Sequence, residues 1–402
     1  MYVYYFFAAI SIWFGVQSLR GGFRFASYVR REMERPLEDY KPFVSVIAPC
    51  RGLESGLADN LQALLVQNYP AYEVLFVLDR EDDPVISIIP KLESWLNCVS
   101  QRTIIAGPAS DSGQKVHNLI AAVKEVAGRT EVIVFVDTDA RPGVNWLRAL
   151  VAPLKDTNLG ASSGYRWFLP VRGNFASRLR SVWNASIASA LGANQNKNFC
   201  WGGSTAIRRS TFQESDIVRR WRGTVSDDFT ITRTLKEARL PIHFCPSALI
   251  PSFGDCNVHE LIEFTTRQLK ITRVYAPHLW KPLLLGSLIF NLTFWVGILI
   301  LLIRLTTAGS VAILASTLGV LFILGSLKAF IRWRAVRIPL NEYRKLLRRD
   351  LFAQVFFWPL ASSLYLYNAV VAGLSRRIVW RGITYELKSP NEAVIISRTG
   401  SH

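Results

Sequence analysis

The chain has 402 residues, of which 50% are hydrophobic and 19% are charged, and its formal net charge at pH 7 is +17. This length leaves room for a soluble domain of ordinary size and for membrane-embedded segments. A strong positive charge can indicate nucleic-acid binding, but many of these basic residues cluster between two apolar stretches, where anionic lipid headgroups attract them. No basic groove with interleaved aromatic residues is evident, so nucleic acid is excluded as a partner. The cluster consists of Arg332, Arg334, Arg337, Arg344, Lys345, Arg348 and Arg349.

Four stretches carry no charge and are rich in large apolar residues: residues 1–19, 283–303, 305–327 and 351–375. Each is close to the ~20 residues that a membrane-spanning helix needs. We therefore predict an integral, multi-pass membrane protein with an N-terminal transmembrane anchor at residues 1–20. The anchor is expected to be retained, because no basic segment precedes it and no small-residue cleavage site follows it.

Arginines follow the anchor and none precedes it, which predicts that the soluble block after it faces the cytoplasm. The stretches within 283–327 then form a hairpin that returns to the cytoplasmic side. The last stretch, 351–375, contains Pro359 and a polar Ser362-Ser363 pair. A re-entrant or broken helix and a simple span both stay open there. The five cysteines are scattered without metal-ligand spacing, in agreement with a reducing compartment.

Between residues 41 and 255, strands and helices are predicted to alternate. Each predicted strand is a short run rich in β-branched and aromatic residues, and each predicted helix has apolar residues at helical spacing. Strands are predicted at 43–49, 73–79, 102–107 and 132–137, and helices at 57–67, 85–96 and 116–126. This alternation is typical of a doubly wound, mostly parallel α/β sheet, in which ligands bind beyond the carboxyl ends of the strands.

Acidic residues follow two of these predicted strands. Asp79 ends the second strand and is followed by Asp82 and Asp83, while Asp137 and Asp139 follow the fourth. Carboxylates gathered at one edge repel one another unless a cation bridges them. Mg²⁺ or Mn²⁺ accepts one or two carboxylates and completes its shell with phosphate oxygens, so this edge predicts a metal–diphosphate site. The glycine-rich fingerprints of dinucleotide-binding and P-loop proteins are absent, which disfavours those two chemistries.

Two further motifs lie downstream. The segment WGGSTAIRRSTF at 201–212 joins a flexible Gly-Gly-Ser turn to two arginines, which suits close approach of the backbone to a substrate. The segment SDDF at 226–229 places Asp227 and Asp228 at the start of an amphipathic helix. Helix capping accounts for one acidic residue at a helix start, but it accounts less easily for two adjacent ones. A carboxylate base for an acceptor hydroxyl is a role that one of them suits.

The chain resembles a known family at seven motifs taken in order: PCRG, VLDREDDP, QKVHNL, FVDTDARP, GGSTAIRR, SDDF and RQLKI. They resemble those of the membrane-bound family-2-type glycosyltransferases with the GT-A fold, and most closely the ceramide glucosyltransferase-like branch and its bacterial lipid-glycosylating relatives. The resemblance implies inverting, metal-dependent transfer of a hexose from a UDP-sugar, expected to be UDP-glucose, to a hydroxyl of a membrane lipid such as ceramide. It implies a cytosolic GT-A domain at 41–255, an interfacial helix at 256–281, transmembrane or re-entrant helices at 282–375 and a tail at 376–402.

The resemblance also assigns roles to individual residues. Asp139 is expected to bind the metal, Mg²⁺ or Mn²⁺, and Asp228 to act as the catalytic base, while Asp137 faces the nucleoside. Asp79, with Asp82 or Asp83, is expected on the uracil and ribose side of UDP. The expected donor-binding residues are Pro49, Arg51, Gly52, Asp79, Asp83, Lys115, Asn118, Asp137 and Thr138. The expected diphosphate and acceptor residues are Gly203, Ser204, Asp227, Arg267, Gln268, Lys270 and Arg273.

The motif RQLKI at 267–271 departs from the family pattern (Q/R)xxRW. Lys270 replaces an arginine and provides a point charge without the bidentate fork. Ile271 replaces the tryptophan that processive synthases use beside the acceptor sugar, which favours a single transfer to a lipid over a processive polysaccharide synthase. The altered motif is the one hint of a non-catalytic lipid-binding scaffold. Residues 175–191 are predicted to form an amphipathic helix that either lies in the membrane interface or faces a core.

Overall fold

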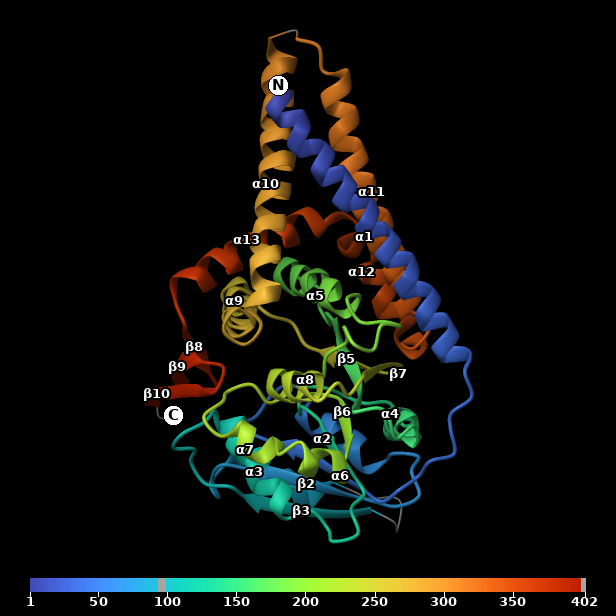
Figure 1. The fold of residues 1–402 in the computed structure, drawn as a ribbon, viewed down its shortest axis with the longest axis vertical. Helices are drawn as coiled ribbons and strands as arrows, with labels where there is room; N and C mark the ends of the chain where they lie inside the picture. The colour runs from blue at the N-terminus through green and yellow to red at the C-terminus, as the bar shows by residue number, and fades with distance from the viewer. Residues whose placement is uncertain (93–98, 308, 399–402) are drawn as a thin grey trace. The chain divides into compact units, whose positions relative to one another are not determined.

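The computed structural model describes residues 1–92, 99–307 and 309–398, which fold into two compact units (Figure 1). We call the first the helical unit; it comprises residues 1–30, 169–190 and 255–375. We call the second the sheet unit; it comprises residues 31–168, 191–254 and 376–402. Each unit is built from segments that lie far apart in the sequence, and each contains hydrophobic clusters of its own.

A seven-stranded sheet in the order β3-β2-β1-β4-β6-β5-β7 forms the centre of the sheet unit (Figure 1). Its strands are β1 (Val44–Pro49), β2 (Tyr72–Leu78), β3 (Val99–Ile105), β4 (Val132–Phe135), β5 (Ala161–Leu169), β6 (Thr205–Arg208) and β7 (Ile242–Phe253). The strands β3, β2, β1 and β4 run parallel, whereas β6 pairs antiparallel with both β4 and β5. The mixed, mostly parallel sheet expected of a GT-A domain is therefore confirmed.

Helices cover the sheet because their apolar stripes match its buried faces. The helices of the sheet unit are α2 (Leu57–Leu65), α3 (Gln114–Lys124), α4 (Trp146–Val151), α6 (Arg209–Glu214), α7 (Ile217–Trp221) and α8 (Asp227–Glu237). One core cluster joins Leu119 of α3, Trp221 of α7 and Leu235 of α8 to strand residues such as Phe135, all of them almost fully buried. This cluster holds α3 and α8 against the sheet.

The predicted helix at 85–96 is wrong in its described part. Residues Pro84–Ser87 and Ile89–Lys91 form two short 3₁₀ turns, and residues 93–96 lie outside the described residues. Pro84 and Pro90 each stand at the start of one turn, where a proline fits, but Pro90 has no N–H with which to continue an α-helix through this segment.

Glu73 is a buried carboxylate in the second parallel strand, and its side chain is fully engaged. Its Oε1 accepts hydrogen bonds from Ser45 Oγ at 2.5 Å and from the backbone N–H of Ala127 at 2.7 Å. Its Oε2 lies 2.9 Å from Nη2 of Arg102. These contacts connect β2 to both neighbouring strands, since Glu73 pairs with Ser45 of β1 and Ser100 of β3 in the sheet register. A buried charge is tolerated because all of its partners are present.

The C-terminal residues of the sheet unit form a second, three-stranded antiparallel sheet in the order β10-β9-β8 (Figure 1). The strands are β8 (Arg377–Trp380), β9 (Ile383–Ser389) and β10 (Glu392–Arg398). The side chains of Ile383, Tyr385 and Leu387 alternate along β9 and are all buried, so this sheet packs one apolar face against the sheet unit.

The helical unit contains seven α-helices in the described part of the chain. They are α1 (Tyr2–Glu34), α5 (Phe175–Ala188), α9 (Val258–Tyr275), α10 (Pro277–Thr306), α11 (Ala312–Val336), α12 (Arg344–Phe356) and α13 (Trp358–Leu374). Among the described residues, three helices, α1, α10 and α11, are long and apolar enough to cross a membrane. The number rises to four if residues Asn341–Phe356 and Trp358–Leu374, which meet at a bend of 70°, form one broken span. The structure therefore contains helices that agree with the predicted membrane association.

One predicted stretch differs in detail, and another shows the break that was one of its two alternatives. The second stretch of the hairpin was expected at 305–327, but its helix begins only at Ala312 and continues to Val336, because a turn with Gly309 separates α10 from α11. The stretch 351–375 is broken at Phe357, next to Pro359, which stands in the first turn of α13. A proline there lacks the N–H that would continue helix α12.

Helix α5 faces the core of the helical unit. Trp183 is fully buried and stacks on Tyr365 of α13, with ring centroids 4.8 Å apart and an interplanar angle of 18°. The hydroxyl of Tyr365 donates a hydrogen bond to the backbone carbonyl of Trp183 at 2.8 Å. Of the two alternatives for this segment, the core-facing helix is the one observed.

Candidate active site

The acidic residues gather at one edge of the seven-stranded sheet, as expected. Asp79 directly follows β2, and Asp137 and Asp139 follow β4, while β1 lies between these two strands in the sheet. Because β1, β2 and β4 run parallel, their carboxyl ends meet at the same edge. Buried apolar strands thus hold three carboxylates at one edge of the sheet.

Lys115 connects this edge to the start of α8. Its Nζ lies 2.7 Å from Oδ1 of Asp137 and 3.1 Å from Oδ1 of Asp227. Burial acts to lower the pKa of Lys115, but Asp137 and Asp227 outweigh it and raise the pKa, so the ammonium group stays charged. Lys115 therefore fixes a positive charge between carboxylates that come from two different elements.

Arg166, on strand β5, is a second buried cation at the same place. Its Nη1 lies 2.9 Å from Oδ2 of Asp139, and its Nη2 lies 3.2 Å from Oδ2 of Asp137. The guanidinium also stacks over the ring of Trp201, 4.7 Å from the centroid. Burial acts to raise the pKa of Asp137, but Lys115 and Arg166 outweigh it and hold the pKa below its ordinary value. Both aspartates thus have cationic partners within the protein.

The loop after β1 approaches Asp79 and Asp83, which both come from the end of β2. Nη1 of Arg51 lies 3.2 Å from Oδ2 of Asp79. The backbone N–H of Gly52 donates to both carboxylate oxygens of Asp83, at 3.2 and 3.0 Å, and Asp83 also caps the 3₁₀ turn at Val85. Oδ1 of Asp79 is buried and has no hydrogen-bond partner in the described part of the chain. It is therefore an acceptor that a donor group of a ligand can satisfy.

Asp227 and Asp228 differ in their surroundings although they are adjacent. Asp227 is buried, and its Oδ2 has no hydrogen-bond partner among the described residues. Burial raises the pKa of Asp227 to about 6, although Lys115 opposes this change. Asp228 is only partly buried, and its Oδ1 accepts from Ser226 Oγ at 2.5 Å and from the N–H of Phe229 at 2.7 Å. The helix start thus orients Asp228 and leaves it accessible.

Gly202 and Gly203 allow the chain to pass close to these charges. A Cβ atom on Gly202 would lie 2.4 Å from Oδ2 of Asp227 and 2.7 Å from Nζ of Lys115. A Cβ on Gly203 would lie 2.2 Å from the ring of Trp201. The Gly-Gly turn is therefore required by packing at the site itself.

Three other predicted residues use their polar groups inside the protein. Asn118 is buried on α3 and accepts a hydrogen bond from Nε2 of Gln114 at 2.8 Å. The backbone carbonyl of Thr138 accepts from Asn60 Nδ2 at 3.0 Å. Ser204 is fully buried, and its Oγ accepts from Nε1 of Trp146 at 2.8 Å. Pro49 is the last residue of β1 and is partly exposed at the same edge.

The motif RQLKI lies on α9 in the helical unit. Nη1 of Arg267 is 3.5 Å from Oε1 of Glu263, one helical turn away. Arg273 donates a hydrogen bond from Nη1 to the backbone carbonyl of Ala372 at 2.5 Å and lies over the ring of Trp280. Gln268 and Lys270 are partly buried on the same helix, and burial lowers the pKa of Lys270. Arg267 and Arg273 thus make contacts within their own unit.

No group of three or more His, Cys, Asp or Glu side chains that could hold a metal ion occurs in the described ranges. A dedicated, all-protein metal cage is therefore not found there. The acidic edge does fit a divalent ion that takes one or two carboxylates and receives its other ligands from a diphosphate and water. The side chain of Asp139 is 38% exposed and that of Asp137 is 21% exposed, so Asp139 is the more accessible of the two.

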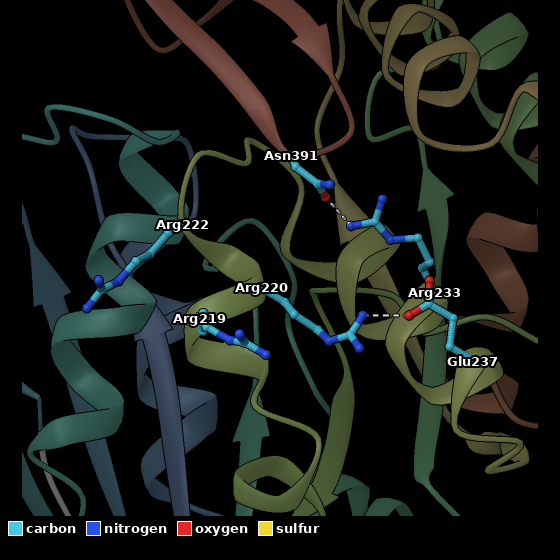
Figure 2. A pocket seen from close by; sticks show the side chains of 6 residues that line it. All are labelled: Arg219, Arg220, Arg222, Arg233, Glu237 and Asn391. Atoms are coloured by element: carbon cyan, nitrogen blue, oxygen red, sulfur yellow. Dashed lines mark hydrogen bonds and ion pairs between the residues drawn. The ribbon is translucent and has the colours of Figure 1, made fainter.

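A hollow of about 340 Å³ lies elsewhere on the sheet unit (Figure 2). It is lined by Arg219, Arg220, Arg222, Arg233, Glu237 and Asn391. In it, Arg220 pairs with Glu237, and Arg233 donates a hydrogen bond to the side-chain oxygen of Asn391 (Figure 2). None of these residues belongs to the acidic edge or to a motif that the sequence singled out.

Sequence reasoning missed Arg166, Glu54 and Arg381. Arg166 is the one charged residue of β5, whose nine residues are all buried, and a cation in such a strand signals a buried partner. Arg381 pairs with Glu54, although the two residues are far apart in the sequence. No local pattern reveals a contact of that kind.

Comparisons with known proteins place the chain in a family. The family model described as Glycosyl transferase family 21 matches residues 3–393. Ceramide glucosyltransferase 1 of Caenorhabditis elegans is 27% identical over 97 residues, which are 24% of this chain and 20% of that protein. Ceramide glucosyltransferase 3 of the same organism is 25% identical over 83 residues, 21% of this chain and 18% of that protein. The alignments thus span about a fifth of these relatives.

Two solved structures are similar in fold at low sequence identity. A mannosyltransferase from Pyrobaculum calidifontis, in complex with GDP-Man and Mn²⁺, has 16% identity and a TM-score of 0.46, and the match covers 92% of this chain and 99% of that chain. GalNAc-T7, with UDP, GalNAc and Mn²⁺, has 14% identity and a TM-score of 0.40, and the match covers 55% of this chain and 45% of that chain.

Proposed function

Because the chain belongs to glycosyl transferase family 21, we propose that it moves a hexose from a UDP-sugar to a hydroxyl group of a membrane lipid. UDP-glucose is the proposed donor, and ceramide is the proposed type of acceptor, as in the names of the two nematode relatives. The observation that carries the proposal is the acidic edge, where Lys115 lies between Asp137, which follows β4, and Asp227, at the start of α8. Such a site suits a charged diphosphate donor and an acceptor hydroxyl that must lose a proton.

The nucleoside end of the donor is assigned to the end of β2. The unpartnered Oδ1 of Asp79 accepts a hydrogen bond from the uracil ring or the ribose, and Arg51 holds the other oxygen of that carboxylate in place. Asp83 supports this position indirectly, because it fixes the backbone of Gly52. A buried acceptor without a partner discriminates between ligands that can and cannot donate to it.

Asp139 is the proposed ligand of Mg²⁺ or Mn²⁺, and Asp137 supports it from the same turn. An ion held by Asp139 would supply positive charge against the diphosphate. Arg166 neutralises the two aspartates, and it donates to Oδ2 and Oδ1 of Asp139 at 2.9 and 3.4 Å, so both oxygens of this carboxylate face a cation that the incoming ion would compete with. Lys115 keeps a permanent positive charge next to Asp137.

Asp228 is the proposed base. It is partly exposed and oriented by its hydrogen bonds at the start of α8, whereas Asp227 is buried beside Lys115. Asp228 takes the proton of the acceptor hydroxyl, the hydroxyl oxygen attacks the anomeric carbon, and the bond from that carbon to the UDP oxygen breaks. A single displacement of this kind inverts the configuration at the anomeric carbon.

We propose that the protein is an integral membrane protein and that its sheet unit lies on the cytoplasmic side. The support comes from α1, α10 and α11, which have the length and composition of spanning helices. Arginines follow the first apolar stretch. Their position supports the proposal that the segment after α1 is cytoplasmic.

The decisive experiment incubates the purified full-length protein, in lipid nanodiscs, with a panel of UDP-sugars, a total lipid extract and either Mn²⁺, Mg²⁺ or EDTA. Mass spectrometry of the lipids is expected to show a mass increase of one hexose that depends on the divalent ion. Products with long series of added sugars would instead indicate a processive synthase. Absence of any glycosylated product across the panel would overturn the proposal.

A further inference from the structure

The C-terminal sheet is fastened to the loops that surround the acidic edge. The hydroxyl of Tyr385, on β9, accepts a hydrogen bond from the backbone N–H of Gln114 at 3.1 Å, next to Lys115 in the chain. Arg398, on β10, bonds to the side chain of the same Gln114 and to the backbone carbonyl of Ala109. These contacts join residues more than 250 positions apart. The sheet is therefore a fixed part of the sheet unit.

Arg381 stands at the tip of the hairpin between β8 and β9. Trp380 pairs with Ile383, so the connection consists of Arg381 and Gly382 alone. Both have positive φ, 51° for Arg381 and 73° for Gly382, which is the pattern of a type I′ turn. Asparagine, aspartate or glycine is preferred at the first of these positions, because other side chains are strained at positive φ. An arginine kept in a strained position points to a function for its side chain.

The guanidinium of Arg381 forms an ion pair with Glu54, in the loop that follows β1. Both side chains remain accessible, at 39% exposed for Arg381 and 31% for Glu54. Arg51 lies three residues before Glu54 in the same loop, and its Nη1 is 3.2 Å from Oδ2 of Asp79. The ion pair of Arg381 and Glu54 is therefore held by the loop that contacts the acidic edge.

We infer that Arg381 binds the diphosphate of the donor and that Glu54 holds its side chain in place until the donor arrives. This inference rests on the proposed function. A guanidinium group presents parallel N–H donors to two phosphate oxygens, which makes the contact both strong and directional. The expected diphosphate ligands on α9 are less suited to such a two-point contact. Lys270 has no guanidinium group, and Arg273 already donates to the backbone carbonyl of Ala372. The C-terminal hairpin therefore supplies the arginine that the altered RQLKI motif lacks.

The test measures binding of UDP, UMP and uridine to the full-length protein in nanodiscs by calorimetry, in the presence of Mn²⁺. Arg381→Asn is the main variant, because asparagine suits the type I′ turn and is expected to preserve or raise thermal stability. It should weaken UDP binding by about 10- to 100-fold while uridine binding stays unchanged. Arg381→Lys, which keeps the charge but not the fork, should lie in between. Arg377→Ala, an exposed arginine on the adjacent strand β8, is the matched control and should bind all three ligands like the wild type.

Glu54→Gln separates a ligand role from a merely structural ion pair. If Glu54 competes with the diphosphate for Arg381, the glutamine variant binds UDP several-fold more tightly than the wild type, opposite to the effect of Arg381→Asn. Equal losses in both variants for UDP and uridine alike, or wild-type UDP binding in Arg381→Asn, would overturn the inference. A wild-type protein that binds no UDP would contradict the proposed donor instead, so the two failures are distinguishable.

Discussion

Nη1 of Arg166 lies 2.9 Å from Oδ2 of Asp139, so the carboxylate proposed to bind a metal already has a cationic partner from strand β5. Arg166 is buried and extends to Asp137 as well, which makes it the main counter-charge for both aspartates besides Lys115. Arg166 and Lys115 together offset the repulsion between the neighbouring carboxylates of Asp137 and Asp139. The contact between Arg166 and Asp139 also implies that a divalent ion and Arg166 stabilise the same charges.

Replacement of Arg166 by methionine should therefore make the fold depend on the metal. We expect the free energy of unfolding in EDTA to fall by about 2 kcal/mol, less than for a fully buried pair because Asp139 is partly exposed. Mn²⁺ should then raise the melting temperature of the variant more than that of the wild type, as thermal unfolding in nanodiscs will show. Arg220→Met, which removes an exposed pair with Glu237, is the control and should cost under about 1 kcal/mol. An equal Mn²⁺ shift in both proteins would contradict this account.

Asp139→Ala should remove the effect of the metal on UDP binding. The wild type is expected to bind UDP more tightly with Mn²⁺ than with EDTA, whereas the two titration curves of the variant should coincide. Asp39→Ala provides the control, because Asp39 is exposed, pairs with Lys41 and belongs to none of the proposed sites. A variant at Asp139 that keeps the full Mn²⁺ dependence would exclude this residue as the ligand.

Asp228→Asn should separate binding from transfer. Asparagine keeps the shape of the side chain but does not accept the proton of the hydroxyl, so we expect the transfer rate to fall by about 100-fold or more while UDP binding is unchanged. Asp227→Asn should instead affect UDP binding and rate together, because it weakens the partner of Lys115. Single-turnover rates and calorimetry measure the two effects. Retained turnover in Asp228→Asn would identify another group as the base.

The pH dependence should show a change near pH 6 that belongs to Asp227. Burial raises the pKa of Asp227 to about 6, so the protein gains a proton there as the pH falls and the ion pair with Lys115 weakens. We expect kcat/KM to decrease as the pH falls through about 6 and expect this limb to be displaced in Asp227→Asn. A profile of the variant identical to that of the wild type would assign the limb to another group.

The raised pKa of Asp227 also predicts how the free energy of unfolding changes with pH. Because its folded-state pKa lies above its ordinary value, the folded protein binds more protons than the unfolded chain between about pH 4 and 6. Its contribution to the free energy of unfolding is therefore present at low pH and is lost as the pH rises through about 6. Asp137, whose pKa is lowered, acts oppositely and in a lower window, with its contribution lost as the pH falls below its ordinary value. Chemical denaturation of the wild type and Asp227→Asn across pH 4 to 7 checks the first of these slopes.

Gly202→Ala should damage the site without disturbing the sheet. The new Cβ would lie 2.4 Å from Oδ2 of Asp227 and 2.7 Å from Nζ of Lys115, so these two side chains must move. A displacement of about 1 Å at a reacting site costs up to about 100-fold in rate, and we expect a loss of about 10- to 100-fold in kcat/KM. Gly192→Ala is the matched control, because nothing lies within 4 Å of its added Cβ. Equal activity of the two variants would show that the close approach at Gly202 is unimportant.

Local patterns were sufficient for the first four strands and for α2 and α3. The runs at 43–49, 73–79, 102–107 and 132–137 are rich in β-branched residues and end at turns, and each coincides with a strand of the sheet. The parallel arrangement followed from the helices between them, and it brought Asp79 and Asp137 to one edge as expected. The helix predicted at 85–96 was wrong because of two prolines. Pro84 and Pro90 fit the starts of short turns but not the interior of a helix.

Arg51 and Lys115 were among the expected residues, but two other cations, Arg166 and Arg381, were not predictable in this way. Arg166 and Arg381 reach their partners through long-range packing of β5 and of the C-terminal hairpin, which no periodicity encodes. The roles that the resemblance implied for Asp139, Asp228 and the donor-binding residues stay predictions until the variants are measured. What the structure adds is the pairing of Lys115 with both Asp137 and Asp227.

Glu73 has a consequence for how the sheet assembles. Its carboxylate finds Ser45, Arg102 and the N–H of Ala127 together only when β1, β2 and β3 are aligned as observed. A slip of one residue would turn this buried charge toward the opposite face and leave it without partners, at a cost of several kcal/mol. Glu73 therefore disfavours misaligned pairings of β2 with its neighbours during folding. Correct alignment in turn fixes the position of Asp79, which lies six residues further along the chain.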